Sequence, residues 1–195
     1  MAPKGRSTRR PARSSAPKPL SLTPRDAQAI FEYNRAVFDR FARRLQRLSW
    51  KAVTAERQTG HHTLFDTLVH ILNVHEVWLE YIVRGRTSDQ ELGALFEDAR
   101  RKPKTWKEFD AYARRVWAAV DDTLGAETAI SLGRRVKVFW MPGDYTARDA
   151  VLQATIEQAH HLGEVIGALW QENTQPPDMT WLDLHRAAQR KTRRR

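Results

Sequence analysis

The chain has no cysteine among its 195 residues. Disulfide bonds, thiolate metal sites and a cysteine nucleophile are therefore excluded, and a cytoplasmic location is the simplest interpretation. No apolar run approaches the roughly 18–20 residues that cross a bilayer, so no membrane insertion is expected. The basic N-terminus is not followed by an apolar stretch, which argues against a secretory signal.

Several catalytic motifs are also missing. The sequence contains no glycine-rich phosphate loop, no G-x-S-x-G elbow and no H-E-x-x-H pair of zinc ligands. A two-metal carboxylate site needs Glu-x-x-His on two helices. That pattern occurs once, from Glu157 to His160, with no second copy. A di-iron protein is therefore not expected.

Acidic residues are almost absent from the two ends of the chain, although the net charge is +10 overall. Residues 1–25 and 182–195 carry 13 of the 33 basic residues and 1 of the 23 acidic ones. The remaining part holds 20 basic and 22 acidic residues, a net charge of −2. The basicity therefore belongs to the ends, which are suited to contact with nucleic acid or another polyanion.

Composition divides the chain into one domain and two tails. Residues 1–23 are rich in Pro, Ser, Arg and Lys and have few large apolar side chains, so they bury too little surface to order. We expect a disordered tail over 1–23, a helical domain over 24–181 and a second basic tail over 182–195. A non-catalytic bundle that binds nucleic acid through these tails is the alternative to an enzyme.

Apolar residues recur at three- and four-residue steps in four long segments, which predicts four helices. The expected helices span residues 24–49, 63–83, 106–124 and 146–172. The second is apolar almost all round and should be the most buried. Thr23-Pro24 is a helix start, and Thr146 with Asp149 forms another. With few strand signals, the pattern predicts an all-α fold, a four-helix bundle.

Three shorter segments carry weaker signals. A helical piece is expected around 91–101, and the alternating segment 135–140 suggests extended chain. Pro142-Gly143 should turn the chain before the last helix.

Six of the seven histidines lie in or just before the second and fourth helices. Glu157 and His161 are four residues apart and share one helix face, so they are suited to clamp a divalent ion. A third ligand must come from another helix, where His70 is central. His75 and His160 are rival ligands that periodicity cannot rank. The alternative is that such residues are packed core or surface side chains.

Two histidines precede the second helix. We expect His61 and His62 to face solvent or to cap that helix. Trp140 and Tyr145, just before the last helix, are candidates to line a site mouth, although packing is the favoured role for both.

Two stretches resemble the DinB-like (YfiT-like) family of metalloenzymes over about residues 26–175. The first is Thr67-Leu-Val-His70-Ile-Leu-Asn-Val-His-Glu-Val-Trp78-Leu, and the second is Glu157-Gln-Ala-His-His161-Leu-Gly-Glu164. They resemble the family's second-helix and last-helix patterns, in the same order.

The resemblance implies a four-helix bundle with a divalent ion held by His70, Glu157 and His161. Glu157 stands where the family usually has the first His of H-x-x-x-H, which favours harder or borderline ions or leaves a metal-free site. Zn, Ni and Mn are the candidate ions. Glu164, one turn beyond His161, is a candidate catalytic base or a partner that orients His161.

The resemblance also implies an activity and partners. Family members with known activity include thiol-dependent S-transferases and isomerases that use low-molecular-weight thiols, and homodimers are common among them. We therefore expect a metal-dependent transferase or hydrolase that acts on a small molecule, with a low-molecular-weight thiol as a possible partner.

Overall fold

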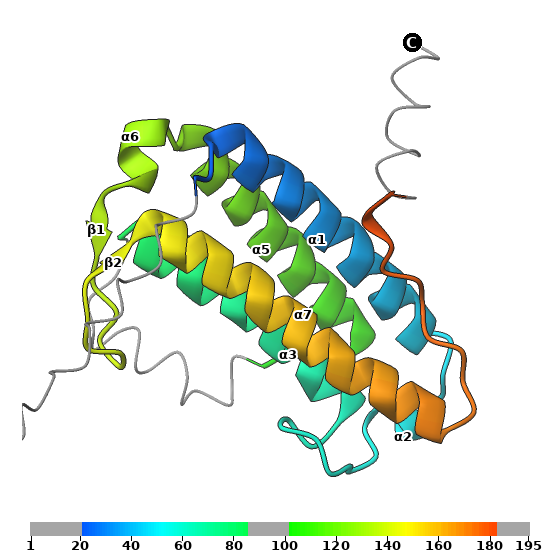
Figure 1. The fold of residues 1–195 in the computed structure, drawn as a ribbon. Helices are drawn as coiled ribbons and strands as arrows, with labels where there is room; N and C mark the ends of the chain where they lie inside the picture. Colours follow the sequence, from blue (N-terminus) through cyan, green and yellow to red (C-terminus); the bar gives the residue numbers. More distant parts are fainter. Residues whose placement is uncertain (1–20, 86–101, 183–195) are drawn as a thin grey trace, which may run out of the picture.

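The computed structural model describes residues 21–85 and 102–182. Four long helical segments form the fold (Figure 1), so the predicted all-α architecture is confirmed. They are α1 (Pro24–Leu45), α3 (Leu64–His75) continued by η1 (Glu76–Val83), α5 (Trp106–Ala126) and α7 (Ala147–Gln171). The short elements are α2 (Trp50–Val53), α6 (Ala129–Leu132), β1 (Arg135–Val136) and β2 (Tyr145–Thr146). None of the helices described is both long enough and apolar enough to span a bilayer.

Some predictions fall outside the described residues. They include most of both basic tails, the nucleic-acid binding expected of them, and the helical piece around 91–101. At the N-terminal boundary, Leu22 is buried in the core and Thr23 caps α1. The ordered domain therefore includes two residues that the sequence assigned to the tail.

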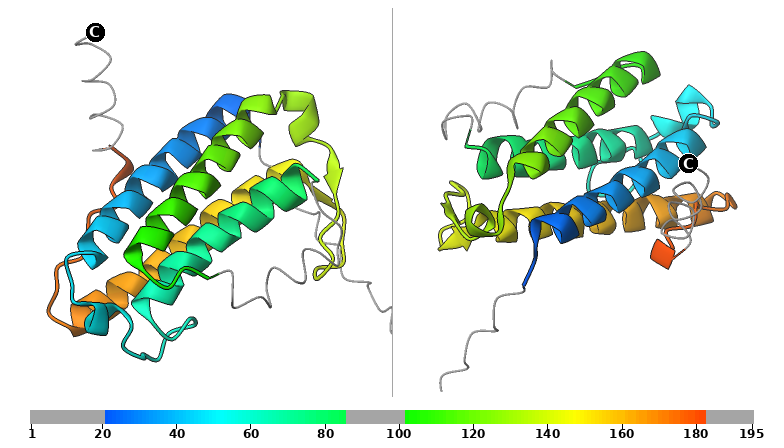
Figure 2. Two further views of the ribbon diagram at one scale, coloured as in Figure 1. Left: turned by 180° about the vertical axis from the view of Figure 1, so that it is seen from behind. Right: turned by 90° about the horizontal axis from the view of Figure 1, so that it is seen from above.

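The continuous rod of α3 and η1 is flanked by two of the other long helices. It packs against α7 on one side and α5 on another, and α1 contacts both α5 and α7 (Figure 2). The apolar residues of this rod are buried along its length, as its all-round apolar pattern predicted.

A threonine caps the N-terminus of each of α1, α3, α5 and α7, and its side chain accepts a hydrogen bond from a backbone N–H of the first turn. Thr23 and Thr146 form capping boxes with Asp26 and Asp149, so both predicted starts are confirmed. Each hydroxyl accepts the third backbone N–H of its helix, while the aspartate accepts the cap's own N–H. The start of α7 sets the register of its Glu157 and His161.

The structure corrects two helix boundaries. The first helix was expected to reach Ser49 but ends at Leu45; Ser49 instead caps α2, and its hydroxyl accepts the Ala52 N–H. The second predicted helix is continuous over Leu64–Val83 but becomes a π-helix from Glu76 onward, and Arg84 N–H donates to Leu79 O five residues back. Hydrophobic periodicity does not distinguish these two winding patterns.

The extended segment expected over 135–140 is shorter in the structure. Only residues 135–136 form a strand, paired antiparallel with 145–146 in the register Arg135 to Thr146. Beyond the strand, the Met141 N–H donates to Val138 O and the chain turns. The sequence alternation extends to residue 140, but β2 provides backbone partners for residues 135 and 136 alone, so the strand ends there.

Glu76 is a buried carboxylate, 5% exposed, at the start of η1. It accepts hydrogen bonds from the Tyr112 hydroxyl at 2.7 Å and from Arg115 Nη1 at 2.6 Å. Burial and the Glu76 charge raise the pKa of Tyr112, so its hydroxyl remains a donor.

We expect Glu76→Ala to lower the free energy of unfolding by about 2 kcal/mol, because two donors lose their acceptor. Urea unfolding measures this, and exposed Glu32→Ala is the control; equal stabilities would contradict it.

Candidate metal centre

Three imidazoles from different parts of the chain meet on one face of the bundle. His70 projects from α3, His161 from α7 and His61 from the loop before α3. The His61 and His70 rings are stacked with centroids 3.7 Å apart, and the His161 ring lies 4.6 Å from His70 and 4.9 Å from His61. One ring nitrogen from each residue lies within 4.8 Å of the others. The predicted pair of His70 and His161 is therefore brought together.

His61 was expected to face solvent or cap α3, and the structure shows that this is wrong. It is half-buried in the cluster, and Thr63 caps the helix instead. A tight turn places it there: the His62 N–H donates to Thr59 O, and His62 has a φ of 63°. His62 itself is exposed. Loop residues carry no periodic signal, so sequence spacing alone had no way to find His61.

Glu157 lies beside the cluster, one helical turn before His161. Its Oε2 is 3.7 Å from His161 Nε2, and its Oε1 accepts a hydrogen bond from Gln153 Nε2 at 2.9 Å. The group of three donor atoms that includes His70 contains His61 in place of Glu157. Glu157 is thus positioned to share an ion with His161, while the structure adds a third imidazole to the predicted set.

Glu164 contacts the other side of the His161 ring. Its Oε2 lies 2.9 Å from His161 Nδ1, and its Oε1 accepts the Gly60 N–H at 3.4 Å. A carboxylate bonded to Nδ1 favours the tautomer with its proton there, which leaves the Nε2 lone pair toward Glu157. Glu164 therefore orients His161 and also ties the His61 loop to α7.

Burial and neighbouring charges set the protonation of the cluster. Burial lowers the pKa of His61, and it lowers the pKa of His70 to about 3. Both imidazoles are therefore neutral near pH 7, as metal ligation requires. The Glu157 carboxylate, followed by Glu164, raises the pKa of His161 against the effect of burial.

The two carboxyl groups respond in turn to His161. The pKa of Glu157 is lowered, chiefly by His161. Burial alone would raise the pKa of Glu164, but the bonds from His161 and the Gly60 N–H outweigh it and lower the pKa. Both side chains are therefore carboxylates at neutral pH.

The two rival histidines have different surroundings. His75 is fully buried, with its Nε2 2.7 Å from Gln158 Oε1 and its ring against Phe31 and Trp117. It belongs to the core rather than to the cluster. His160 is exposed and lies close enough to form a second group of donors with His161 and Glu164.

Trp140 and Tyr145 make packing contacts. The Trp140 ring lies 5.3 Å from the Trp78 ring, and Tyr145 covers Gly143, where a Cβ would come within 2.9 Å of its ring. The Tyr145 hydroxyl donates to Pro142 O at 3.4 Å. These contacts account for both side chains without a role at the site.

The donor set fits a divalent transition-metal ion. Imidazole nitrogen suits Zn, Ni and Fe, and an added carboxylate extends the range to harder ions. Two ligands of tetrahedral zinc lie about 3.4 Å apart. The 3.7 Å between His161 Nε2 and Glu157 Oε2 is close to that spacing.

Comparisons with known proteins agree with this fold. The sequence model of the DinB superfamily matches residues 6–165. A crystal structure of a DinB-like protein from Bacillus cereus has a TM-score of 0.62 and 17% identity, covering 82% of this chain and 99% of that one. A DinB-like protein from Bacillus subtilis has a TM-score of 0.56 and 17% identity, covering 78% and 98%. No curated protein matched the chain.

Proposed function

This chain belongs to the DinB superfamily, and we propose that it is a divalent-metal-dependent enzyme that acts on a small molecule. The observation that carries the proposal is the convergence of the imidazoles of His61, His70 and His161 on one face of the bundle. Three neutral-capable nitrogen donors with an adjacent carboxylate form a site of the kind that metalloenzymes use.

Each side chain has a separate task in this proposal. His70, on α3, and His161, on α7, are the two ligands that come from long helices of the bundle. His61 joins them from the loop, and Glu157 provides a carboxylate beside the ion. Glu164 favours the tautomer of His161 that carries its proton on Nδ1. Its carboxylate is also the candidate general base, which would accept a proton from the substrate.

A bound ion would supply Lewis-acid chemistry that lowers the pKa of a thiol or water and so yields a nucleophile at neutral pH. The resemblance to the family favours thiol-dependent S-transfer or hydrolysis, with a low-molecular-weight thiol as one substrate and a homodimer as the working form. The partial burial of His61 and His70 supports a metal-dependent reaction, since reduced solvent around the site strengthens the effect of the ion's charge.

Metal content tests the proposal. Purified tag-free protein should contain about one divalent ion per chain by elemental mass spectrometry, and His70→Ala and His161→Ala should each lose it. His160→Ala, which removes the exposed neighbour of His161, is the matched control and should retain the ion. If wild-type protein takes up no Zn²⁺, Ni²⁺ or Mn²⁺ on incubation, the proposal is wrong.

A further inference from the structure

Four arginines lie at the C-terminal end of α1 and in the turn that follows it. Arg43 and Arg44 lie three and four residues after Arg40, so both are its neighbours on the helix surface, and Arg47 follows in the turn after Leu45. Like charges at these spacings repel each other and destabilise a helix. The C-terminal dipole of α1 favours nearby cations but amounts to about half an elementary charge, so it does not balance four of them.

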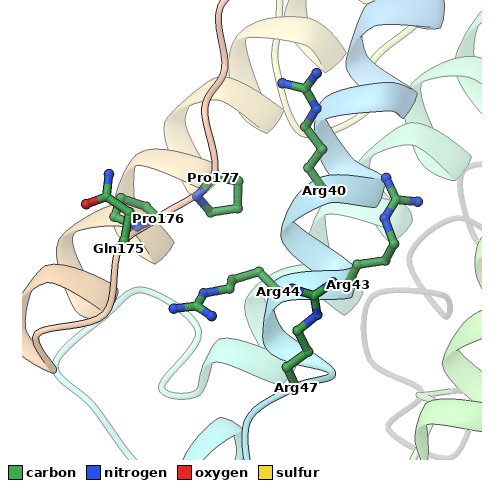
Figure 3. Close-up of a pocket in the computed structure, with 7 residues that line it drawn as sticks. All are labelled: Arg40, Arg43, Arg44, Arg47, Gln175, Pro176 and Pro177. Atoms are coloured by element: carbon green, nitrogen blue, oxygen red, sulfur yellow. The ribbon is translucent and has the colours of Figure 1, made fainter.

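These arginines line a groove against the segment that follows α7. Gln175, Pro176 and Pro177 form the opposite wall of a space of about 260 Å³ (Figure 3). Arg44 reaches from α1 toward this wall, whereas Arg43 directs its guanidinium away from it (Figure 3). The volume lies below the range of pockets for drug-sized molecules, so the groove suits a small ligand.

Within residues 21–85 and 102–182, none of the four arginines forms an ion pair, although six other arginines there do. Arg40 donates to the backbone oxygen of Asp178 at 3.1 Å. The Asp178 carboxylate instead accepts bonds from Thr180, and Asp39 is the acid close to Arg43.

Arg44 is the least satisfied of the group. Its Nε is shielded from solvent and has no hydrogen-bond partner among the described residues. A buried donor without an acceptor costs free energy. The terminal nitrogens of the Arg44 guanidinium, which extends toward the proline wall (Figure 3), are the donors that a ligand in the groove would meet.

We propose that this groove binds a small oxyanion of the phosphate class, either free diphosphate or the diphosphate end of a nucleotide. Planar guanidinium groups donate pairs of parallel hydrogen bonds to phosphate oxygens. A diphosphate carries enough negative charge to relieve the repulsion among Arg40, Arg44 and Arg47. Pro176 and Pro177 form a wall with fixed φ angles, which needs little ordering when a ligand enters.

Calorimetric titration of the full-length chain with inorganic pyrophosphate, and separately with ADP, tests the proposal. Arg44→Gln and Arg47→Gln should each weaken binding at least about tenfold, because each removes charge-assisted hydrogen bonds. Arg44→Lys, which keeps the charge but loses the paired donors, should also weaken it. Arg135→Gln is the matched control: it removes the same charge from an exposed position and should stay within about twofold.

The other outcomes overturn the proposal. If Arg44→Gln and Arg135→Gln weaken binding equally, the ligand is held by diffuse charge, including that of the basic ends. If His161→Ala abolishes binding, the ligand sits at the histidine cluster instead. If neither pyrophosphate nor ADP binds to wild-type protein, the groove is not a phosphate site.

Discussion

Replacing His61 by alanine is expected to weaken zinc binding at least about 100-fold. Loss of an outer partner of a metal ligand already costs 10–100-fold, and the proposed site uses His61 as a direct ligand, with one ring nitrogen within 4.8 Å of a nitrogen of His70 and of His161. A chelating fluorescent indicator in competition with the protein measures the affinity. His62→Ala is the matched control, because it changes the next, exposed residue of the same turn.

The same titration decides what Glu157 does. Glu157 occupies the position where the family usually has the first His of H-x-x-x-H, yet the group of donors that joins α3 to α7 consists of the imidazoles of His61, His70 and His161. We expect Glu157→Gln to weaken zinc binding by about tenfold, less than His61→Ala, as for a residue that supports the site. The opposite order would show that Glu157 is the third ligand and that His61 merely covers the site.

If His61 is a ligand, the loop before α3 is part of the metal centre. The bond from the Gly60 N–H to Glu164 links this loop to α7, so Glu164 would influence two ligands at once. Loss of Glu164 would then alter the orientation of His161 and the position of His61 together. A carboxylate that only acted as a base would leave metal affinity unchanged, which the titration of Glu164→Gln detects.

Acid is expected to destabilise the metal-free protein by roughly 3 kcal/mol between pH 7 and pH 4 through His75 alone. Burial lowers the pKa of His75 to about 4 from its ordinary 6.5, against the opposing bond from Gln158. The unfolded chain therefore binds this proton more readily than the folded one. The contribution is fully present above pH 6.5 and is lost as the pH falls toward 4.

The groups around His75 explain why its protonation destabilises the fold. Its ring contacts Phe31 on α1, Trp117 on α5 and Gln158 on α7, and its Nδ1 has no partner among the described residues. No charged group contributes to the shift; burial is the main cause. Protonation would therefore place an uncompensated charge in the core.

Urea unfolding in the presence of EDTA, at pH 7 and pH 4, measures the effect. Carboxylates and His70 also lose stability in acid, so the comparison is between wild type and His75→Leu. The variant should be less stable at pH 7, because Gln158 loses its partner, but its stability should fall by about 3 kcal/mol less in acid. The control variant His62→Gln, at an exposed position, should lose as much stability between pH 7 and pH 4 as wild type. If His75→Leu also loses as much as wild type, protonation of His75 is not the cause.

Local rules in the sequence determined the helices and their starts. The apolar stripes predicted four long helices, and Thr23 and Thr146 with their aspartates predicted two capping boxes, because these signals act within one or two turns. The one-turn spacing of Glu157 and His161 made this pair candidates for the site, whereas the resemblance to the DinB-like family completed the set with His70 and Glu164. Where each one lies relative to the others still depended on how the helices pack.

Tertiary structure alone decided the remaining features. His61 joins the cluster because a turn in an irregular loop folds back over α3, and no periodicity records such a turn. The arginine groove exists because the chain after α7 returns alongside α1, more than 120 residues away in sequence. The rotation of α3 about its own axis decides that His75 faces the core and His70 faces the cluster. Because this helix is apolar almost all round, its sequence does not specify that rotation.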